Sequence, residues 1–183
     1  MGTERIILGI DPGTTVMGYG LIRVIKKEPE LITLGVLQLN KLHDPYVKLQ
    51  KIFTRTLQLI DEYHPGELAI ESPFYGKNVQ SMLKLGRAQG VAISAALYRS
   101  LPVHEYAPRK IKQAITGQGS ASKEQVALLI EKILKTGELH EMLDATDAVA
   151  VAMCHFYQRD IPGSGQSFNS WKDFIAQNPG RVK

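Results

Sequence analysis

The sequence predicts an α/β fold, and three observations support this prediction. Apolar runs of strand length open the chain and recur later between stretches with helical periodicity. The first three strand-like segments are joined by short links, which are typical of an antiparallel meander. After them, helices and strands alternate, so that the order reads strand, strand, strand, helix, strand, helix, strand and three helices.

The composition indicates one globular domain followed by a tail. The chain has 183 residues, of which 44% are hydrophobic and 22% charged, which suits a substantial core and argues against extensive disorder. We expect the domain at residues 1–159 and a partly flexible tail at 160–183, which opens with a linker-like composition.

Neither a membrane span nor a signal peptide is visible. The single cysteine, Cys154, excludes an intrachain disulfide, fits a cytoplasmic location and is expected to be a buried core thiol.

The first half of the chain is expected to form the meander, a helix and a strand. The meander strands are predicted at about residues 4–11, 18–25 and 30–38. Asp44 and Pro45 predict a helix start, because aspartate caps helices and proline is favoured at the first helical position. That helix should end near residues 63–66, and a short buried strand then runs to Glu71.

The second half is expected to be mainly helical. A long helix is predicted at about residues 78–99, with Asn78 as its cap and small residues that permit close helix packing. A short strand should follow at 102–106. Further helices are predicted from Pro108 to about Thr116, at about 122–135 and at about 142–157.

Two predicted strands end in acidic residues. Asp11 follows the apolar run 6–10 and precedes Pro-Gly, so its carboxylate lies where a buried strand opens into a loop. If the helix from Asp44 forms a right-handed crossover, the strand ending at Glu71 lies parallel to the first. Because adjacent strands are about 4.8 Å apart, the two carboxylates could share a metal ion. The alternative is that Asp11 only stabilises the turn.

Two further acidic residues lie near the start of the last predicted helix. Asp144 and Asp147 are three positions apart, so both should point to one side of this helix. The rest of the helix is apolar nearly all round, which predicts that it is buried. Carboxylates on its inner side would need a cation to offset their desolvation. A favourable interaction with the helix dipole is the alternative explanation for the pair.

The four carboxylates and the charge distribution together predict a metal-dependent nuclease. Carboxylates without a cysteine cluster favour Mg²⁺ or Mn²⁺ over zinc. Two such ions can activate water and stabilise the leaving oxygen in phosphodiester hydrolysis. The net charge of +4 arises in the middle of the chain, where residues 77–132 carry nine basic and three acidic side chains. Such a segment favours a polyanionic ligand, although a solvated helix face would give the same count.

Several motifs in this chain occur in an order that resembles a known family. They are Ile-Leu-Gly-Ile-Asp-Pro-Gly from residue 7, Gly-Tyr-Gly from 18, Ala-Ile-Glu from 69, Lys77-Asn78, Leu-Lys-Leu-Gly-Arg-Ala-Gln-Gly-Val-Ala from 83, Gly-Ser-Ala from 119 and Asp-Ala-Thr-Asp-Ala from 144. Over about residues 4–158 the sequence resembles the RuvC family of Holliday junction resolvases, which are crossover junction endodeoxyribonucleases.

The resemblance implies a fold and an activity. The fold is ribonuclease H-like, with a mixed five-stranded sheet of three antiparallel and then two parallel strands, flanked by helices. The activity is the resolution of Holliday junctions by paired symmetric nicks that leave 5′-phosphates, in homologous recombination and DNA repair. It implies two Mg²⁺ ions per subunit, with Mn²⁺ as a substitute. It also implies a homodimer and partnership with the RuvA and RuvB branch-migration complex.

The resemblance also implies roles for individual residues. The four metal-binding positions are Asp11, Glu71, Asp144 and Asp147. Phe74 corresponds to an aromatic residue that stacks on junction bases; the alternative is a loop aromatic folded onto the core. Lys112 and Lys123 occupy basic positions implicated in phosphate contact or catalysis, and Lys123 lies beside a predicted helix N-terminus, which itself attracts anions. The DNA-binding face is expected to include Lys77, Lys84 and Arg87 as well. Both His140 and His155 are expected to be structural; the alternative is a metal ligand or a base.

Three other functions fit parts of the sequence. The segment from Gly9 to Thr15 also resembles the first phosphate loop of the actin, chaperone and sugar-kinase superfamily, which uses two such domains where this chain has one. A non-catalytic junction-binding protein would have no need of four carboxylates. A nuclease acting on RNA–DNA hybrids would share the fold but read the 2′-hydroxyl.

Overall fold

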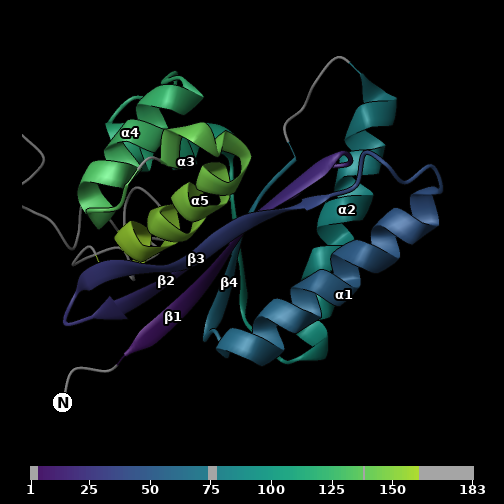
Figure 1. Cartoon of the computed structure of the whole chain (residues 1–183), viewed down its shortest axis with the longest axis horizontal. Coiled ribbons are helices and arrows are strands. Elements are labelled where there is room, and N and C mark those ends of the chain that lie inside the picture. Colours follow the sequence, from purple (N-terminus) through teal and green to yellow (C-terminus); the bar gives the residue numbers. More distant parts are fainter. Residues whose placement is uncertain (1–3, 74–77, 138, 161–183) are drawn as a thin grey trace, which may run out of the picture.

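The computed structural model describes residues 4–73, 78–137 and 139–160, in which a five-stranded sheet separates two groups of helices (Figure 1). The strands are β1 (Arg5–Asp11), β2 (Val16–Ile25), β3 (Glu28–Gln38), β4 (Glu67–Glu71) and β5 (Val103–Tyr106). The helices are α1 (Pro45–Tyr63), α2 (Val79–Tyr98), α3 (Pro108–Thr116), α4 (Lys123–Leu134), the 3₁₀ turn η1 (Leu139–Glu141) and α5 (Leu143–Asp160). None of the described helices is long and apolar enough to cross a membrane.

The sheet is mixed, as predicted. Its strand order is β3-β2-β1-β4-β5, with β1, β2 and β3 antiparallel and with β4 and β5 parallel to β1. The predicted order of elements is confirmed, apart from η1, which falls in a link to which the sequence assigned no structure. The last helix runs to Asp160, three residues beyond its predicted end. The predicted α/β class and the ribonuclease H-like arrangement are therefore correct.

Local sequence explains where the helices begin. The Asp44 carboxylate accepts the backbone N–H of Tyr46 at 2.7 Å, which caps α1, and Pro45 occupies the first helical position. Asn78 caps α2 in the same way. At α4, Ser122 and Gln125 form a reciprocal capping box. These caps satisfy backbone donors that would otherwise lack partners at the helix ends.

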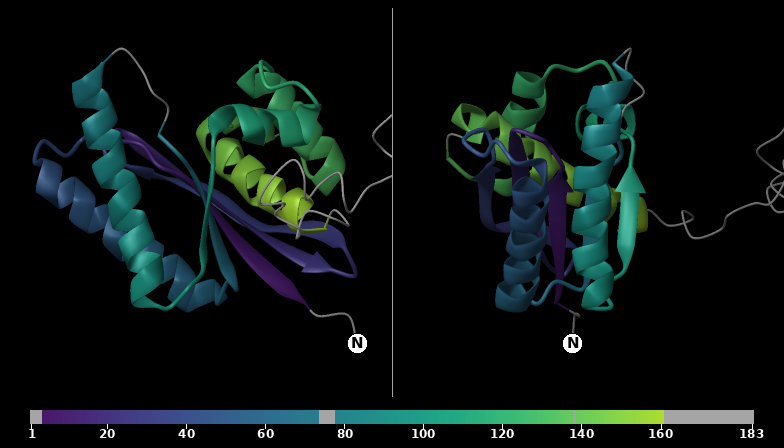
Figure 2. Two further views of the ribbon diagram at one scale, coloured as in Figure 1. Left: turned by 180° about the vertical axis from the view of Figure 1, so that it is seen from behind. Right: turned by 90° about the vertical axis from the view of Figure 1, so that its right-hand side faces the viewer.

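Each face of the sheet has its own core. Figures 1 and 2 show α1 and α2 together on one face and α3, α4 and α5 on the other. Because successive strand side chains point to opposite faces, β1 contributes to both cores. Ile7 packs in the core under α5, whereas Leu8 and Ile10 pack in the core under α1 and α2. Cys154 on α5 is buried, as predicted.

Helix α5 rests directly on the backbone of the sheet. A Cβ atom added to Gly9 on β1 would overlap the backbone carbonyl of Ala148 in α5. One added to Gly18 on β2 would overlap the carbonyl of Asp144. Glycine at these two positions therefore sets how closely the start of α5 approaches β1 and β2, and so where the acidic residues of α5 lie.

The close approach at Gly9 gives a prediction about stability. Gly9→Ala should lower the free energy of unfolding by about 3 kcal/mol, because the methyl group forces α5 away from β1. The matched control is Gly86→Ala on α2, where an added Cβ meets nothing within 4 Å. That change should stabilise the helix by up to about 1 kcal/mol. Urea unfolding of both variants measures the difference, and equal effects would contradict direct contact between α5 and β1.

Candidate active site

Two acidic side chains converge where β1 and β4 end. Asp11 is the last residue of β1 and Glu71 the last of β4, and the strands pair in parallel with Ile10 opposite Ile70. The two carboxylates therefore leave the same edge of the sheet on adjacent strands. Between them and the helices α3, α4 and α5 lies a cavity of about 220 Å³. Its charged lining among the described residues consists of Asp11, Glu71, Asp147, Lys112 and Lys123.

The two aspartates of α5 differ in position. Asp147 lines the cavity, and its side chain is only 18% exposed. Asp144 lies at the rim with 55% of its side chain exposed, and it lines a neighbouring groove beside β3. Asp144 is therefore less enclosed than Asp147, although the Lys123 ammonium group lies near both carboxylates. Three helical steps turn a side chain by about 300°, so the two carboxylates point roughly 60° apart around the helix.

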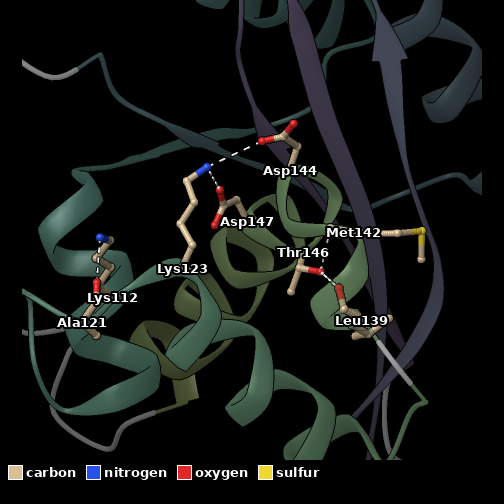
Figure 3. Close-up of polar contacts among 8 residues, drawn as sticks. All are labelled: Lys112, Ala121, Lys123, Leu139, Met142, Asp144, Thr146 and Asp147. Atoms are coloured by element: carbon tan, nitrogen blue, oxygen red, sulfur yellow. Dashed lines mark hydrogen bonds and ion pairs between the residues drawn. The ribbon is translucent and has the colours of Figure 1, made fainter.

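Lys123 joins the two aspartates. It is the first residue of α4, and its ammonium group contacts the carboxylate of Asp147 and lies 3.6 Å from that of Asp144 (Figure 3). Partial burial works against its charged form, but the hydrogen bond and charge of Asp147, with the charges of Asp11 and Asp144, raise the pKa of Lys123 above its usual value. Lys123 is thus a fixed positive charge in an acidic cavity.

The carboxyl groups of Asp11 and Glu71 resist ionisation. Burial and the charges of Asp147 and Asp144 raise the pKa of Asp11 to about 7, against the opposing effect of Lys123. Burial, followed by the charges of Asp11 and Asp147, raises the pKa of Glu71 to about 8. Among the described residues, three carboxylates and two lysines line the cavity, so its acidic side chains outnumber its basic ones.

The other predicted DNA contacts fall in different places. Lys112 lines the cavity, and its ammonium group donates to the backbone carbonyl of Ala121 at 2.8 Å (Figure 3). Both Lys84 and Arg87 are exposed on α2, where they line a separate groove of about 390 Å³ between α1, α2 and the loop after β1. Phe74, Lys77 and the side chain of His140 lie outside the described residues.

Sequence reasoning missed two residues that hold the site in place. Gln89 on α2 is buried, and its amide donates to the Glu105 carboxylate at 2.8 Å and to the backbone carbonyl of Glu71 at 3.4 Å. Thr146 is also buried, and its hydroxyl donates to the carbonyls of Leu139 and Met142, which fixes the start of α5 against η1 (Figure 3). A polar residue among apolar helix neighbours is the signal that marks both.

Acidic residues end two adjacent parallel strands of the sheet, and a third acidic residue lies on the helix across them. Together with the strand order, this arrangement defines a nuclease of ribonuclease H-like fold. Comparison with known proteins specifies the family. A family model described as "Crossover junction endodeoxyribonuclease RuvC" matches residues 7–155. The chain belongs to this RuvC family, and it is an endonuclease that acts on DNA.

Individual relatives agree with this assignment. The chain is 58% identical to the crossover junction endodeoxyribonuclease RuvC of Christiangramia forsetii, covering 99% of this chain and 94% of the relative. It is 57% identical to that of Bacteroides fragilis, covering 98% and 97%. Among solved structures, Thermus thermophilus RuvC in complex with a Holliday junction substrate superposes with a TM-score of 0.75 at 28% identity, covering 85% of this chain and 94% of that one.

Proposed function

We propose that this endonuclease resolves Holliday junctions by paired symmetric nicks at the cavity between β1, β4 and α5. The observation that carries the proposal is the convergence of Asp11, Glu71 and Asp147 on a cavity that also holds two lysines. The structural likeness to Thermus thermophilus RuvC, which was solved with a Holliday junction, supports a junction as the substrate. Homologous recombination and DNA repair are the processes that require this reaction.

The residues of the cavity fit divalent cations. Their donors are carboxylate oxygens, which suit hard ions such as Mg²⁺ and Mn²⁺. Burial and neighbouring carboxylates raise the pKa values of Asp11 and Glu71, so a cation in the cavity would favour their ionised forms. Two Mg²⁺ ions, held by these residues with Asp144 and Asp147, would supply that positive charge. When bound, such ions activate the attacking water and stabilise the leaving oxygen.

The side chains of the protein then have distinct tasks. Asp11 and Glu71 hold their carboxylates at fixed strand ends, so the ligand geometry is preorganised before DNA arrives. Lys123 offsets the negative charge that develops on the phosphate, and Lys112 contacts the DNA backbone. The Lys123 ammonium sits at the N-terminus of α4, where backbone N–H groups also attract a phosphate.

Two further features support a homodimer bound to junction DNA. Large apolar side chains are exposed along α2, namely those of Val79, Leu83, Leu97 and Tyr98, and a second subunit would cover them. A two-fold dimer matches the symmetry of a junction and places two active sites on it.

The proposed division of the chain is a nuclease domain at 1–159 and a tail at 160–183. RuvA and RuvB are the proposed partners and the cytoplasm the proposed location.

The decisive experiment compares substrates. A labelled four-way junction, a linear duplex and an RNA–DNA hybrid of the same sequence would be incubated with the protein and Mg²⁺, and in parallel with EDTA. We expect symmetric nicks in the junction alone, lost with EDTA. Glu71→Gln should bind the junction without cutting it. Cleavage of the hybrid instead would mean a different substrate, and binding without cleavage by the wild type would mean a non-catalytic protein.

The groove lined by Lys84 and Arg87 gives a prediction about DNA binding. Its position beside the loop after β1 puts it at the same edge of the sheet as the cavity. Replacing both residues with alanine should reduce the slope of log affinity against log salt by about two, because two phosphate contacts are lost. Lys132→Met on α4 is the control, expected to leave the slope unchanged. Titrations of a labelled junction at several salt concentrations measure this slope. If the double variant has the slope of the wild type, the groove is not part of the DNA-binding face.

A further inference from the structure

A second group of metal-ligating side chains lies away from the active site. Glu67 begins β4, four residues before Glu71 at the opposite end of the same strand. His155 is on α5, eight residues after Asp147, which is about 12 Å along the helix. His104 lies on β5, opposite Ala69 of β4. These three residues therefore meet under the far part of α5, and the proposed cleavage reaction does not use them.

The donor atoms of this group converge. One ligand atom from each of Glu67, His104 and His155 lies within 4.8 Å of the other two. His155 Nε2 is 2.7 Å from Glu67 Oε2, and the rings of His104 and His155 stack with their centroids 4.4 Å apart. Glu67 is 7% exposed and His155 2%, whereas His104 is partly exposed. A buried carboxylate and two imidazoles thus lie together, and His104 is the member nearest the solvent.

Neighbouring groups orient these donors. The Tyr106 hydroxyl lies 2.6 Å from His155 Nδ1, so the other ring nitrogen, Nε2, faces Glu67. Arg159 contacts Oε1 of Glu67 and leaves Oε2 toward His155. In metal sites, a ligating histidine is usually oriented by a hydrogen bond at its second nitrogen, and a ligating carboxylate is itself hydrogen-bonded.

We propose that Glu67, His104 and His155 form a binding site for a transition-metal ion of the Zn²⁺ class, separate from the carboxylate site. Two imidazole nitrogens and one carboxylate oxygen match the ligands that Zn²⁺ takes and differ from the all-oxygen sets of Mg²⁺. The ion replaces the proton between His155 Nε2 and Glu67 Oε2, so its binding releases a proton. It joins β4, β5 and α5, and therefore stabilises the folded chain.

The test measures binding to the full chain in millimolar Mg²⁺, which competes for the carboxylate site. Zn²⁺ affinity is measured by competition with a chromophoric chelator, and Co²⁺ is added in parallel to follow its visible absorption, which is intense for tetrahedral sites. We expect one Zn²⁺ per chain, a tetrahedral Co²⁺ spectrum and a higher melting temperature on adding Zn²⁺. Absence of Zn²⁺ binding by the wild type would overturn the proposal and leave a hydrogen-bonded network only.

Variants locate the bound ion. His104→Ala should weaken Zn²⁺ binding by about 100-fold and abolish the Co²⁺ spectrum. His104→Phe keeps a ring against His155 and should have the same effect, so a folding defect cannot account for the loss. His43→Ala, a change at an exposed histidine in the groove beside α1, is the matched control and should bind as the wild type does. Equal Zn²⁺ affinity in the His104 variants and the wild type would refute the site.

Discussion

Asp11→Asn is expected to abolish cleavage and, at the same time, to stabilise the protein in the absence of divalent cations. The variant loses a charged ligand, so junction cleavage should fall by about 10³-fold or more. Burial and neighbouring carboxylates penalise the ionised form of Asp11, whose pKa they raise to about 7. Asparagine has the same shape without the charge. The melting temperature in EDTA at pH 8 should therefore rise by about 4 °C.

The stabilisation expected from Asp11→Asn depends on pH. The unfolded carboxyl group titrates near 3.8 and the folded one near 7, so the wild type loses stability as the pH rises between these values. The advantage of Asp11→Asn should then shrink as the pH is lowered from 8 toward 4. Asp44→Asn is the matched control, because Asp44 is exposed and asparagine caps α1 equally well. Scanning calorimetry in EDTA measures both variants. If Asp11→Asn melted at a lower temperature than the wild type at pH 8, the charge of Asp11 would not destabilise the cation-free protein.

Lys123→Met is expected to slow cleavage while tightening the binding of divalent cations. Without its ammonium group, the developing charge on the phosphate loses a stabilising partner, and the rate of cleavage should fall by about 10²-fold. The same ammonium group neutralises Asp147 and Asp144 in the protein without cations. Its removal leaves these carboxylates uncompensated, so the affinity for Mn²⁺ should rise severalfold.

The two effects of Lys123→Met are separable by experiment. Single-turnover cleavage at saturating Mg²⁺ gives the rate, and electron paramagnetic resonance of free Mn²⁺ gives the affinity. Lys132→Met, in the last turn of the same helix and exposed, should change neither. Weaker Mn²⁺ binding by Lys123→Met would show that the lysine assists cation binding instead of opposing it.

The part of the site that depends on topology could be predicted from the sequence. Asp11 and Glu71 each end an apolar run of strand length bounded by turn signals, and one well-capped helix lies between them in the chain. A right-handed crossover through this helix then places the second strand parallel to the first and beside it. Lys123 was identified through the family resemblance, and its place at a capped helix start supports that assignment.

Details that depend on tertiary contacts could not be predicted. The rotation of α5 about its axis, which turns Asp147 into the cavity and leaves Asp144 at the rim, is set by contact with Gly9 and Gly18. Helical periodicity fixes the angle between the two aspartates but not the direction of either. Likewise, His155 meets Glu67 across 88 positions of sequence, and no local pattern connects them.

The seating of α5 on β1 and β2 has a consequence for how this chain can change in length. Inserting one residue into a helix advances everything beyond it by about 1.5 Å and turns it by about 100°. Within α5, between Asp144 and Ala152, an insertion or deletion would shift either the aspartates or the residues that contact Gly9. Between the end of α4 at Leu134 and η1, the described residues lie outside both this seat and the bonds of Thr146 to Leu139 and Met142, and the same change costs less there. Length differences among relatives should therefore concentrate between α4 and η1 and be absent from α5 itself.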